Sequence, residues 1–206
     1  DCDLVIEAVV EKMGVKKAVI AECEKVITKP FIFGTNTSSL SVNEMARAAT
    51  NPANVVGLHF FNPVHKMKLV EVVAADTSSD ETVAAAKAFG MKVGKTTVVT
   101  GDGPGFVVNR ILSPYMKESI QLLLEGVPAD QIDKAATRFG MPMGPIALMD
   151  EVGLDIVSHV IKVMHAALGD RLAPPSIIAT IEQHKLLGKK GGKGLYLYDE
   201  KGKRAG

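Results

Sequence analysis

Short apolar runs alternate with segments of helical spacing along the first half of the chain. Because each run is short and rich in β-branched residues, buried strands are predicted at residues 3–10, 30–40, 55–61, 68–75 and 95–101. Apolar residues recur at helical spacing in residues 12–27 and 80–89, and Ser41, with Glu44 three residues later, predicts the cap of a short helix. Strands that alternate with helices indicate an α/β layered unit with a largely parallel sheet. Only a few residues around Asn62-Pro63 separate two of the strands, which favours an antiparallel pair at the sheet edge.

The pattern changes at GDGPG, residues 101–105, after which long helical periodicity dominates. Helices are predicted at residues 106–125, 129–139, 145–167 and 175–187, with Pro145 at a first helical position. The tail GKKGGKGLYLYDEKGKRAG is too rich in glycine and lysine to continue a helix and predicts a loop, one short strand and a frayed end. We therefore place a domain boundary here, with an α/β domain at residues 1–102 and a mostly helical domain at 103–206.

Two ionisable residues interrupt neighbouring apolar strands in GLHFFNPVHKMKLVEVV, residues 57–73. Strand alternation places His59 on one face with Val55, and Glu71 on one face with Val73, so each ionisable group has apolar neighbours. Burying a lone charge there is costly, and the cost falls if the two side chains face each other. A carboxylate on one ring nitrogen fixes the tautomer and leaves the other nitrogen for acid–base chemistry. A satisfied buried histidine and an unrelated glutamate at a strand end remain an equal alternative.

Two further polar sites are less distinctive. Ser38 and Ser39, in TNTSSL, follow the end of a strand, where ligands bind in open α/β sheets, but a plain turn with helix-capping serines is the more common explanation. Asn109, in VVNR, begins a predicted helix and would reach a carbonyl in an interdomain cleft, although a solvated helix residue is the commoner case.

Composition narrows the classes of protein without selecting one. The formal net charge of +1 gives no field for nucleic acid or an anionic membrane, and two cysteines in 206 residues favour a reducing compartment. No apolar run reaches the ~18 to 20 residues that span a bilayer. GDGPG lacks the G-x-G-x-x-G spacing, the lysines of GKKGGKG lack the P-loop spacing, and we expect no metal because the remaining histidines show no ligand spacing: His65, His159, His165 and His184.

Several long motifs carry a family resemblance across essentially the whole chain. NTSSL, GLHFFNPVHKMKLVEVV, GDGPGFVVNRIL, FGMPMGPIALMDEVGLD and GKKGGKGLYLYD, in this order, resemble the 3-hydroxyacyl-CoA dehydrogenases. The HKM after FFNPV, and a tail that runs on past YLYDEKGKR, look more like the multifunctional fatty-acid oxidation proteins than the short monofunctional enzymes. The resemblance implies a Rossmann-type NAD-binding domain followed by a helical domain, and NAD-dependent oxidation of (S)-3-hydroxyacyl-CoA to 3-ketoacyl-CoA in β-oxidation.

The resemblance also assigns roles to individual residues. His59 matches the catalytic base and Glu71 the acid paired with it, while Ser38 and Asn109 match ligands of the substrate oxygen. The positions that match the lining of the NAD site are Glu11, Lys16, Ser38, Asn62 and Lys190. The implied partners are the acyl-CoA substrate and either a homodimer formed through the helical domain or a larger β-oxidation complex. A cytoplasmic location is expected for a bacterial source, and a mitochondrial or peroxisomal one for a eukaryote.

One departure from the family pattern concerns the cofactor. The glycine-rich turn of the family, and the acid after its second strand, belong to a first βαβ unit that these 206 residues do not include. We expect the chain to be truncated at its N-terminus and to bind NAD weakly or not at all, because the pyrophosphate cradle supplies much of the affinity. Titration calorimetry with NADH tests this prediction, and micromolar binding would contradict it.

Two other functions fit the same sequence. One is a catalytically silent structural protein with this fold, as in lens crystallins that resemble the family, although the set of Ser38, His59, Glu71 and Asn109 argues against it. The other is a dehydrogenase of 3-hydroxy acids without CoA, for which we expect a catalytic lysine where this chain has Asn109-Arg110.

Overall fold

The computed structural model describes residues 2–205 and divides into two compact units, Asp1–Val107 and Val108–Gly206. The boundary expected from the sequence, between residues 102 and 103, lies in the turn just before this division. The first unit has a buried core on each face of its sheet, and the second unit has a core of its own.

The first unit is built on one five-stranded sheet with the order β1-β2-β3-β4-β5. The strands are β1 Leu4–Glu7, β2 Ile32–Thr35, β3 Val55–Phe60, β4 Leu69–Ala74 and β5 Thr96–Gly101. The pairs β1/β2, β2/β3 and β4/β5 are parallel and β3/β4 is antiparallel, so the predicted largely parallel α/β sheet is confirmed. The expectation that the antiparallel pair lies at the edge is wrong, because β5 pairs with the outer side of β4.

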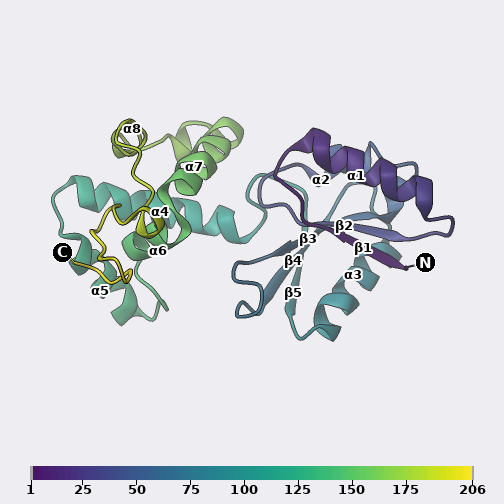
Figure 1. Cartoon of the computed structure of the whole chain (residues 1–206), viewed down its shortest axis with the longest axis horizontal. Coiled ribbons are helices and arrows are strands. Elements are labelled where there is room, and N and C mark those ends of the chain that lie inside the picture. The colour runs from purple at the N-terminus through teal and green to yellow at the C-terminus, as the bar shows by residue number, and fades with distance from the viewer. Residues whose placement is uncertain (1, 206) are drawn as a thin grey trace. The chain divides into compact units, whose positions relative to one another are not determined.

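Helices cover both faces of this sheet (Figure 1). Helices α1 (Met13–Val26) and α2 (Val42–Ala46) pack on one face, and α3 (Asp80–Lys92) packs on the other. The predicted cap of α2 is confirmed, since the Ser41 hydroxyl accepts a hydrogen bond from the Glu44 N–H at 3.1 Å. A short 3-10 helix, η1 (Pro52–Asn54), leads into β3.

Strand alternation sorts the side chains of β3 and β4 between these two layers. Val55 and Val73 belong to the core under α1 and α2, whereas Val56 and Val72 belong to the core under α3. His59 and Glu71 keep the parity of Val55 and Val73, so both belong to the α1/α2 face. The predicted assignment of faces is therefore confirmed.

The second unit contains α4 Val108–Leu124, α5 Ala129–Phe139, α6 Pro145–Val152, α7 Leu154–Leu168 and α8 Ile177–Gln183, with the 3-10 helices η2 Gly169–Leu172 and η3 Lys189–Gly191. The single helix predicted over residues 145–167 is wrong. It is two helices, because Gly153 adopts φ 102°, a conformation that favours glycine and breaks the helical ladder. Ile146, Met149 and Leu154 from this region are buried in one core with Ile120 of α4.

The tail is ordered, and it differs from the short strand and frayed end that we expected. It forms isolated bridges, such as Tyr198 with Arg204, and no continuous strand among the described residues. Fraying is wrong up to Ala205, whose N–H donates to the Leu197 carbonyl at 2.8 Å. The buried Asp150 carboxylate, from α6, accepts hydrogen bonds from the N–H groups of Leu195 and Tyr196 and holds the tail against the core.

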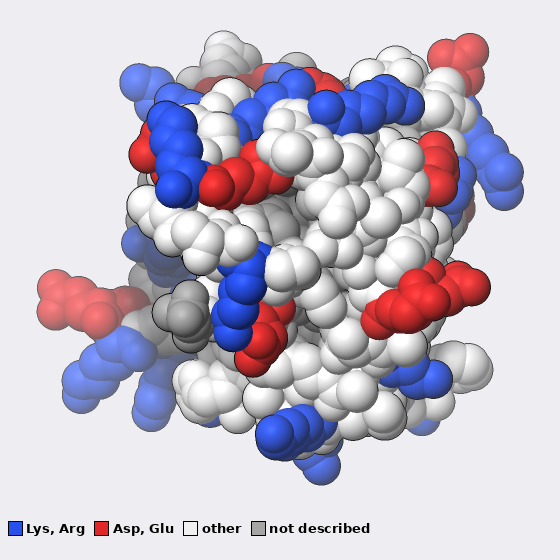
Figure 2. All heavy atoms as spheres, turned by 90° about the vertical axis from the view of Figure 1, so that its right-hand side faces the viewer, with Lys and Arg blue, Asp and Glu red and all other residues white. Residues whose placement is uncertain are grey.

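Neither the charges on the surface nor the hydropathy of the helices points to a particular class of protein. Basic and acidic side chains are interspersed on the face shown in Figure 2, as a net charge of +1 leads one to expect. Within residues 2–205 no single helix is long and apolar enough to cross a bilayer, and the pair Pro145–Val152 and Leu154–Leu172 passes that test only together, bent by 102°.

Candidate active site

The core of the site is a buried histidine–carboxylate hydrogen bond between two neighbouring strands. His59 and Glu71 lie directly opposite each other in the antiparallel register of β3 and β4. The His59 Nδ1 atom is 2.6 Å from Glu71 Oε2, and the two residues are 4% and 0% exposed. The predicted pairing is thus confirmed, and the alternative of two unrelated residues is excluded.

The surroundings of this pair restrict its geometry. The Val107 N–H donates to the other Glu71 oxygen, Oε1, at 2.9 Å, so both carboxylate oxygens are held. The ring of Phe61 lies 4.5 Å from the His59 ring, and the ring of Phe106 meets it edge-on at 5.6 Å. A rigid imidazole with a carboxylate on Nδ1 is the arrangement that fixes a histidine tautomer.

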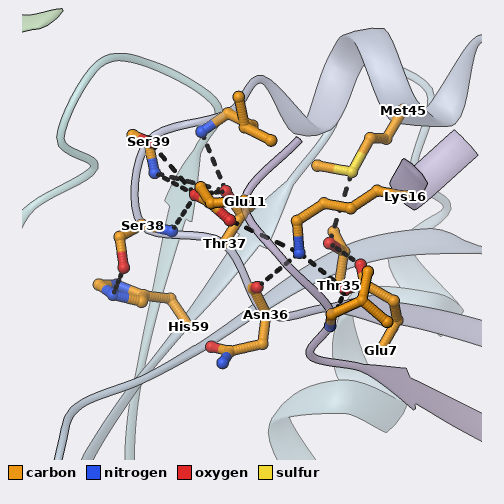
Figure 3. A network of polar contacts seen from close by, with 12 residues as sticks. Glu7, Glu11, Lys16, Thr35, Asn36, Thr37, Ser38, Ser39, Met45 and His59 are labelled. Carbon is orange, nitrogen blue, oxygen red and sulfur yellow. Dashed lines mark hydrogen bonds and ion pairs between the residues drawn. The ribbon is translucent and has the colours of Figure 1, made fainter. Parts of the chain in front are cut away.

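The second ring nitrogen of His59 faces the loop after β2. The Ser38 hydroxyl lies 3.0 Å from His59 Nε2, and the side chain of Ser38 comes from the carboxyl end of β2 (Figure 3). A neutral imidazole carries its proton on one ring nitrogen and accepts a hydrogen bond at the other, so the tautomer with the proton on Nδ1, toward Glu71, leaves Nε2 as the acceptor. In that tautomer Nε2 accepts from the Ser38 hydroxyl and is the ring atom able to take a proton.

Asn36 connects the end of β2, which leads to Ser38, with the end of β3, which carries His59. Its side-chain oxygen accepts from the Phe60 N–H at 3.1 Å, and its own N–H donates to the Glu7 carbonyl at 2.7 Å. The carboxyl ends of β1, β2 and β3 are therefore tied together at one edge of the sheet. Ligands of open α/β sheets bind at this edge.

The loop from Thr37 to Ser39 is held by a single carboxylate. Glu11 Oε1 accepts from the Thr37 hydroxyl at 2.5 Å, from the N–H groups of Ser38 and Ser39 at 3.0 and 3.2 Å, and from the Ser39 hydroxyl at 3.2 Å (Figure 3). Partial burial acts to raise the pKa of Glu11, but these hydrogen bonds and the nearby Lys16 charge outweigh it, and the pKa is lowered. The carboxylate is therefore ionised at neutral pH.

Lys16 is completely buried beneath this loop. Its ammonium nitrogen lies 2.7 Å from Glu7 Oε1, 3.0 Å from the Asn36 carbonyl and 3.5 Å from Glu11 Oε2. The ammonium therefore donates hydrogen bonds to Glu7 and to the Asn36 carbonyl, and forms an ion pair with Glu11. Glu7 is fully held as well, since its second oxygen accepts from the Thr35 hydroxyl at 2.8 Å.

Three of the sequence-predicted residues lie outside this cluster. Asn62 is exposed in the loop that follows β3. Asn109 is half-buried near the start of α4, and Lys190 is exposed and paired with Asp155 at 2.6 Å, both within the second unit. Their assigned roles stay predictions. Among residues 2–205, no three histidine, cysteine or acidic side chains are grouped as metal ligands.

The residues at this edge suit part of a dinucleotide. The Glu11 side chain keeps 36% of its surface exposed beside the carboxyl ends of parallel strands, and an exposed carboxylate accepts hydrogen bonds from ribose hydroxyls. Asn62 is exposed next to β3 and offers both an amide donor and a carbonyl acceptor. Both side chains are thus open to a ligand, and their assignment to the NAD site stays a prediction.

Sequence reasoning did not assign a role to Thr37, Asn36 or Glu7, although each positions the site. The signal for Glu7 was present, because it is an acid inside an apolar strand, like Glu71. Thr37 and Asn36 had no such signal, since polar residues after a strand are typical of any turn.

Comparisons with known proteins agree with this architecture. Residues 1–103 match the family model of the 3-hydroxyacyl-CoA dehydrogenase NAD binding domain, and residues 105–198 match that of the 3-hydroxyacyl-CoA dehydrogenase C-terminal domain. The chain is 45% identical over 205 residues to the fatty acid oxidation complex subunit alpha of Shewanella frigidimarina, covering 100% of this chain and 29% of that relative. It thus spans less than a third of the curated relatives that it matches.

Solved structures show the same similarity. The (S)-3-hydroxybutyryl-CoA dehydrogenase of Ralstonia eutropha superposes with a TM-score of 0.92 at 34% identity, over 96% of this chain and 71% of that one. The 3-hydroxybutyryl-CoA dehydrogenase of Escherichia coli gives 0.89 at 39% identity, over 95% of this chain and 42% of that one.

Proposed function

Because the chain belongs to the 3-hydroxyacyl-CoA dehydrogenase family, we propose that the protein oxidises a (S)-3-hydroxyacyl-CoA to the 3-ketoacyl-CoA, with NAD as the hydride acceptor. The observation that supports this activity is the line of contacts Glu71–His59–Ser38 at the carboxyl edge of the parallel strands. A general base, its orienting acid and a hydroxyl donor are the groups needed to take a proton from an alcohol.

In the proposed reaction the substrate hydroxyl approaches Nε2 of His59 and shares its hydrogen bond with Ser38. Nε2 takes the hydroxyl proton, and the Glu71 carboxylate on Nδ1 stabilises the imidazolium that forms. NAD, when bound, supplies an acceptor for the hydride that leaves the hydroxyl-bearing carbon. Because His59 and Glu71 are buried, the surrounding medium screens the attraction between the imidazolium and the carboxylate poorly.

The activity is tested by following acetoacetyl-CoA reduction with NADH in the full-length protein. NADH oxidation with acetoacetyl-CoA supports the proposal. Turnover of free acetoacetate in its place favours the dehydrogenase without CoA, and no turnover of either compound favours the catalytically silent protein.

The orienting role of Glu71 predicts that Glu71→Gln lowers kcat by about 100-fold, within the range of general acid–base effects. The amide keeps the shape of the side chain but removes the charge that stabilises the imidazolium, so we expect KM for acetoacetyl-CoA to change little. Steady-state kinetics measures both constants. Glu125→Gln, an exposed carboxylate of the second unit, is the control, and equal kcat values in the two variants would contradict the role.

We also propose that the protein works either as a homodimer formed through its helical unit or as part of a larger β-oxidation assembly. The name of the relatives, fatty acid oxidation complex subunit alpha, supports the assembly. A cytoplasmic location in a bacterial source is proposed as well, which the free thiols of Cys2 and Cys23 fit. Light scattering and cell fractionation test these two points.

A further inference from the structure

Glu11 is an exposed residue with an unusual concentration of hydrogen bonds. One of its oxygens accepts four, all from the three consecutive residues Thr37, Ser38 and Ser39. These partners lie 26 to 28 positions further along the chain, so the contact joins the loop after β1 to the loop after β2. The carboxylate therefore fixes the course of the second loop.

Ser38 stands between this carboxylate and the histidine. Its N–H donates to Glu11 Oε1 at 3.0 Å, while its hydroxyl contacts His59 Nε2 at 3.0 Å. The residue before it, Thr37, is 2% exposed and turns the loop by accepting from the Leu40 N–H at 2.9 Å. With its neighbours held on both sides, Ser38 has little freedom to move away from the imidazole.

The Glu11 carboxylate is itself held from below by a buried charge. Lys16 lies 3.5 Å from Glu11 Oε2 and donates to the Asn36 carbonyl at 3.0 Å. The same ammonium therefore contacts both the loop after β1 and the loop after β2. Glu7 balances the charge of Lys16 at 2.7 Å, and each member of this buried group has a partner. The Glu11 carboxylate is therefore held by Lys16, a buried charge that is itself paired with Glu7.

We propose that Glu11 is a positioning residue that acts through Ser38: by holding the Thr37–Ser39 loop, it keeps the Ser38 hydroxyl on His59 Nε2. This proposal rests on the proposed function. It is separate from any contact of Glu11 with NAD, and it gives Lys16 the task of holding Glu11 and Asn36 in place.

The two possible tasks of Glu11 have different kinetic signatures. A residue that only contacts the cofactor changes the KM for NADH, and its effect is the same whatever residue 38 is. A residue that acts through Ser38 lowers kcat at saturating NADH, and its effect disappears once the Ser38 hydroxyl is gone. A double-mutant cycle separates these cases.

The experiment measures kcat for acetoacetyl-CoA reduction at saturating NADH in the full-length protein and its variants. Misplacement of a reacting group by about 1 Å costs up to about 100-fold. We therefore expect Ser38→Ala and Glu11→Ala each to lower kcat by about 10- to 100-fold, and the double variant to be no slower than the slower single one. Glu11→Gln keeps an acceptor oxygen and should lose less than Glu11→Ala. Glu22→Gln, an exposed carboxylate on α1, is the matched control and should equal the wild type.

Amide hydrogen exchange supplies a readout that does not depend on activity. The N–H groups of Ser38 and Ser39 should exchange at least about 10-fold faster in Glu11→Ala than in Glu22→Gln, because their acceptor is lost. The N–H of Phe60, which Asn36 holds, should change less and reports on the integrity of the sheet.

The outcomes separate the inference from the proposed function. If the wild type reduces acetoacetyl-CoA but Glu11→Ala lowers kcat by the same factor with and without Ser38, the positioning role is overturned. Unchanged exchange at Ser38 and Ser39 in Glu11→Ala also overturns it. If the wild type is inactive on acetoacetyl-CoA, the proposed function fails, and the exchange result alone decides whether Glu11 holds the loop.

Discussion

His59→Ala is expected to lower kcat for acetoacetyl-CoA reduction by about 10²- to 10⁴-fold, the usual contribution of a positioned general acid or base. In this direction of the reaction the imidazolium gives its proton to the carbonyl oxygen, and alanine has no proton to give. The ring also holds the Ser38 hydroxyl at 3.0 Å, so the variant loses both the acid and a fixed hydrogen-bond partner. Steady-state kinetics at saturating NADH measures the effect.

The control for this variant is His65→Ala. His65 is exposed in the loop between β3 and β4 and should leave kcat unchanged. Because His59 is nearly buried, its removal also leaves a cavity and takes one partner from Glu71, so thermal unfolding must show that the variant is folded at the assay temperature. A folded His59→Ala protein with wild-type kcat would remove His59 from the mechanism.

The second large effect is expected on stability: Asp150→Ala should lower the free energy of unfolding of the second unit by about 3 kcal/mol or more. Asp150 is fully buried and accepts from the N–H groups of Leu195 and Tyr196 at 2.9 Å each, and from the Tyr198 hydroxyl at 3.0 Å. Alanine leaves these donors buried without their acceptor, at about 1–3 kcal/mol for each donor. A Cβ on Gly194 would overlap this carboxylate, which shows how closely the tail approaches it.

Urea unfolding followed by tyrosine fluorescence measures this effect selectively. The chain has three tyrosines and no tryptophan, and Tyr115, Tyr196 and Tyr198 all belong to the second unit. The control is Glu151→Ala, whose exposed side chain pairs with Lys189 at 2.7 Å and should cost at most about 1 kcal/mol. Equal losses in the two variants would show that Asp150 does not hold the tail.

The two tail tyrosines each donate a hydrogen bond to a buried carboxylate, Tyr198 to Asp150 and Tyr196 to Asp133. Burial and the hydrogen bond to Asp150 raise the pKa of Tyr198 to about 12, and burial with the hydrogen bond to Asp133 raises that of Tyr196. A raised pKa means that the neutral phenol is favoured in the folded state. The stabilisation from these groups is therefore fully present below the ordinary tyrosine pKa, and it is lost as pH rises from there through the raised pKa of the folded state, because the unfolded phenols ionise first.

The sequence predicted the elements of the α/β half well, because strand alternation and helical spacing are local properties. It also predicted the pairing of His59 with Glu71, because burying either ionisable group without a partner would be costly. It missed the break at Gly153, because apolar spacing continues on both sides of that residue and nothing local distinguishes a positive φ from an ordinary helical glycine.

Features that depend on distant segments could not be predicted in this way. Glu11 looks like an ordinary acid before a helix, and its partners lie far along the chain. Asp133 and Asp150 occur within helices, where acids are usually solvated, but both are buried and bind distant segments: Asp150 binds the tail, and Asp133 binds the start of α6 and the tail residue Tyr196. Their importance comes from tertiary contacts that no local pattern records.

The antiparallel pairing of β3 and β4 has a consequence for how this site changes during evolution. His59 and Glu71 face each other across adjacent strands, so insertions or deletions in the connecting loop at residues 62–68 leave their alignment intact. One extra residue inside β4, ahead of Glu71, would instead turn the carboxylate to the α3 side of the sheet. The hairpin can therefore drift in length at its tip while its two strands stay under strict selection for register.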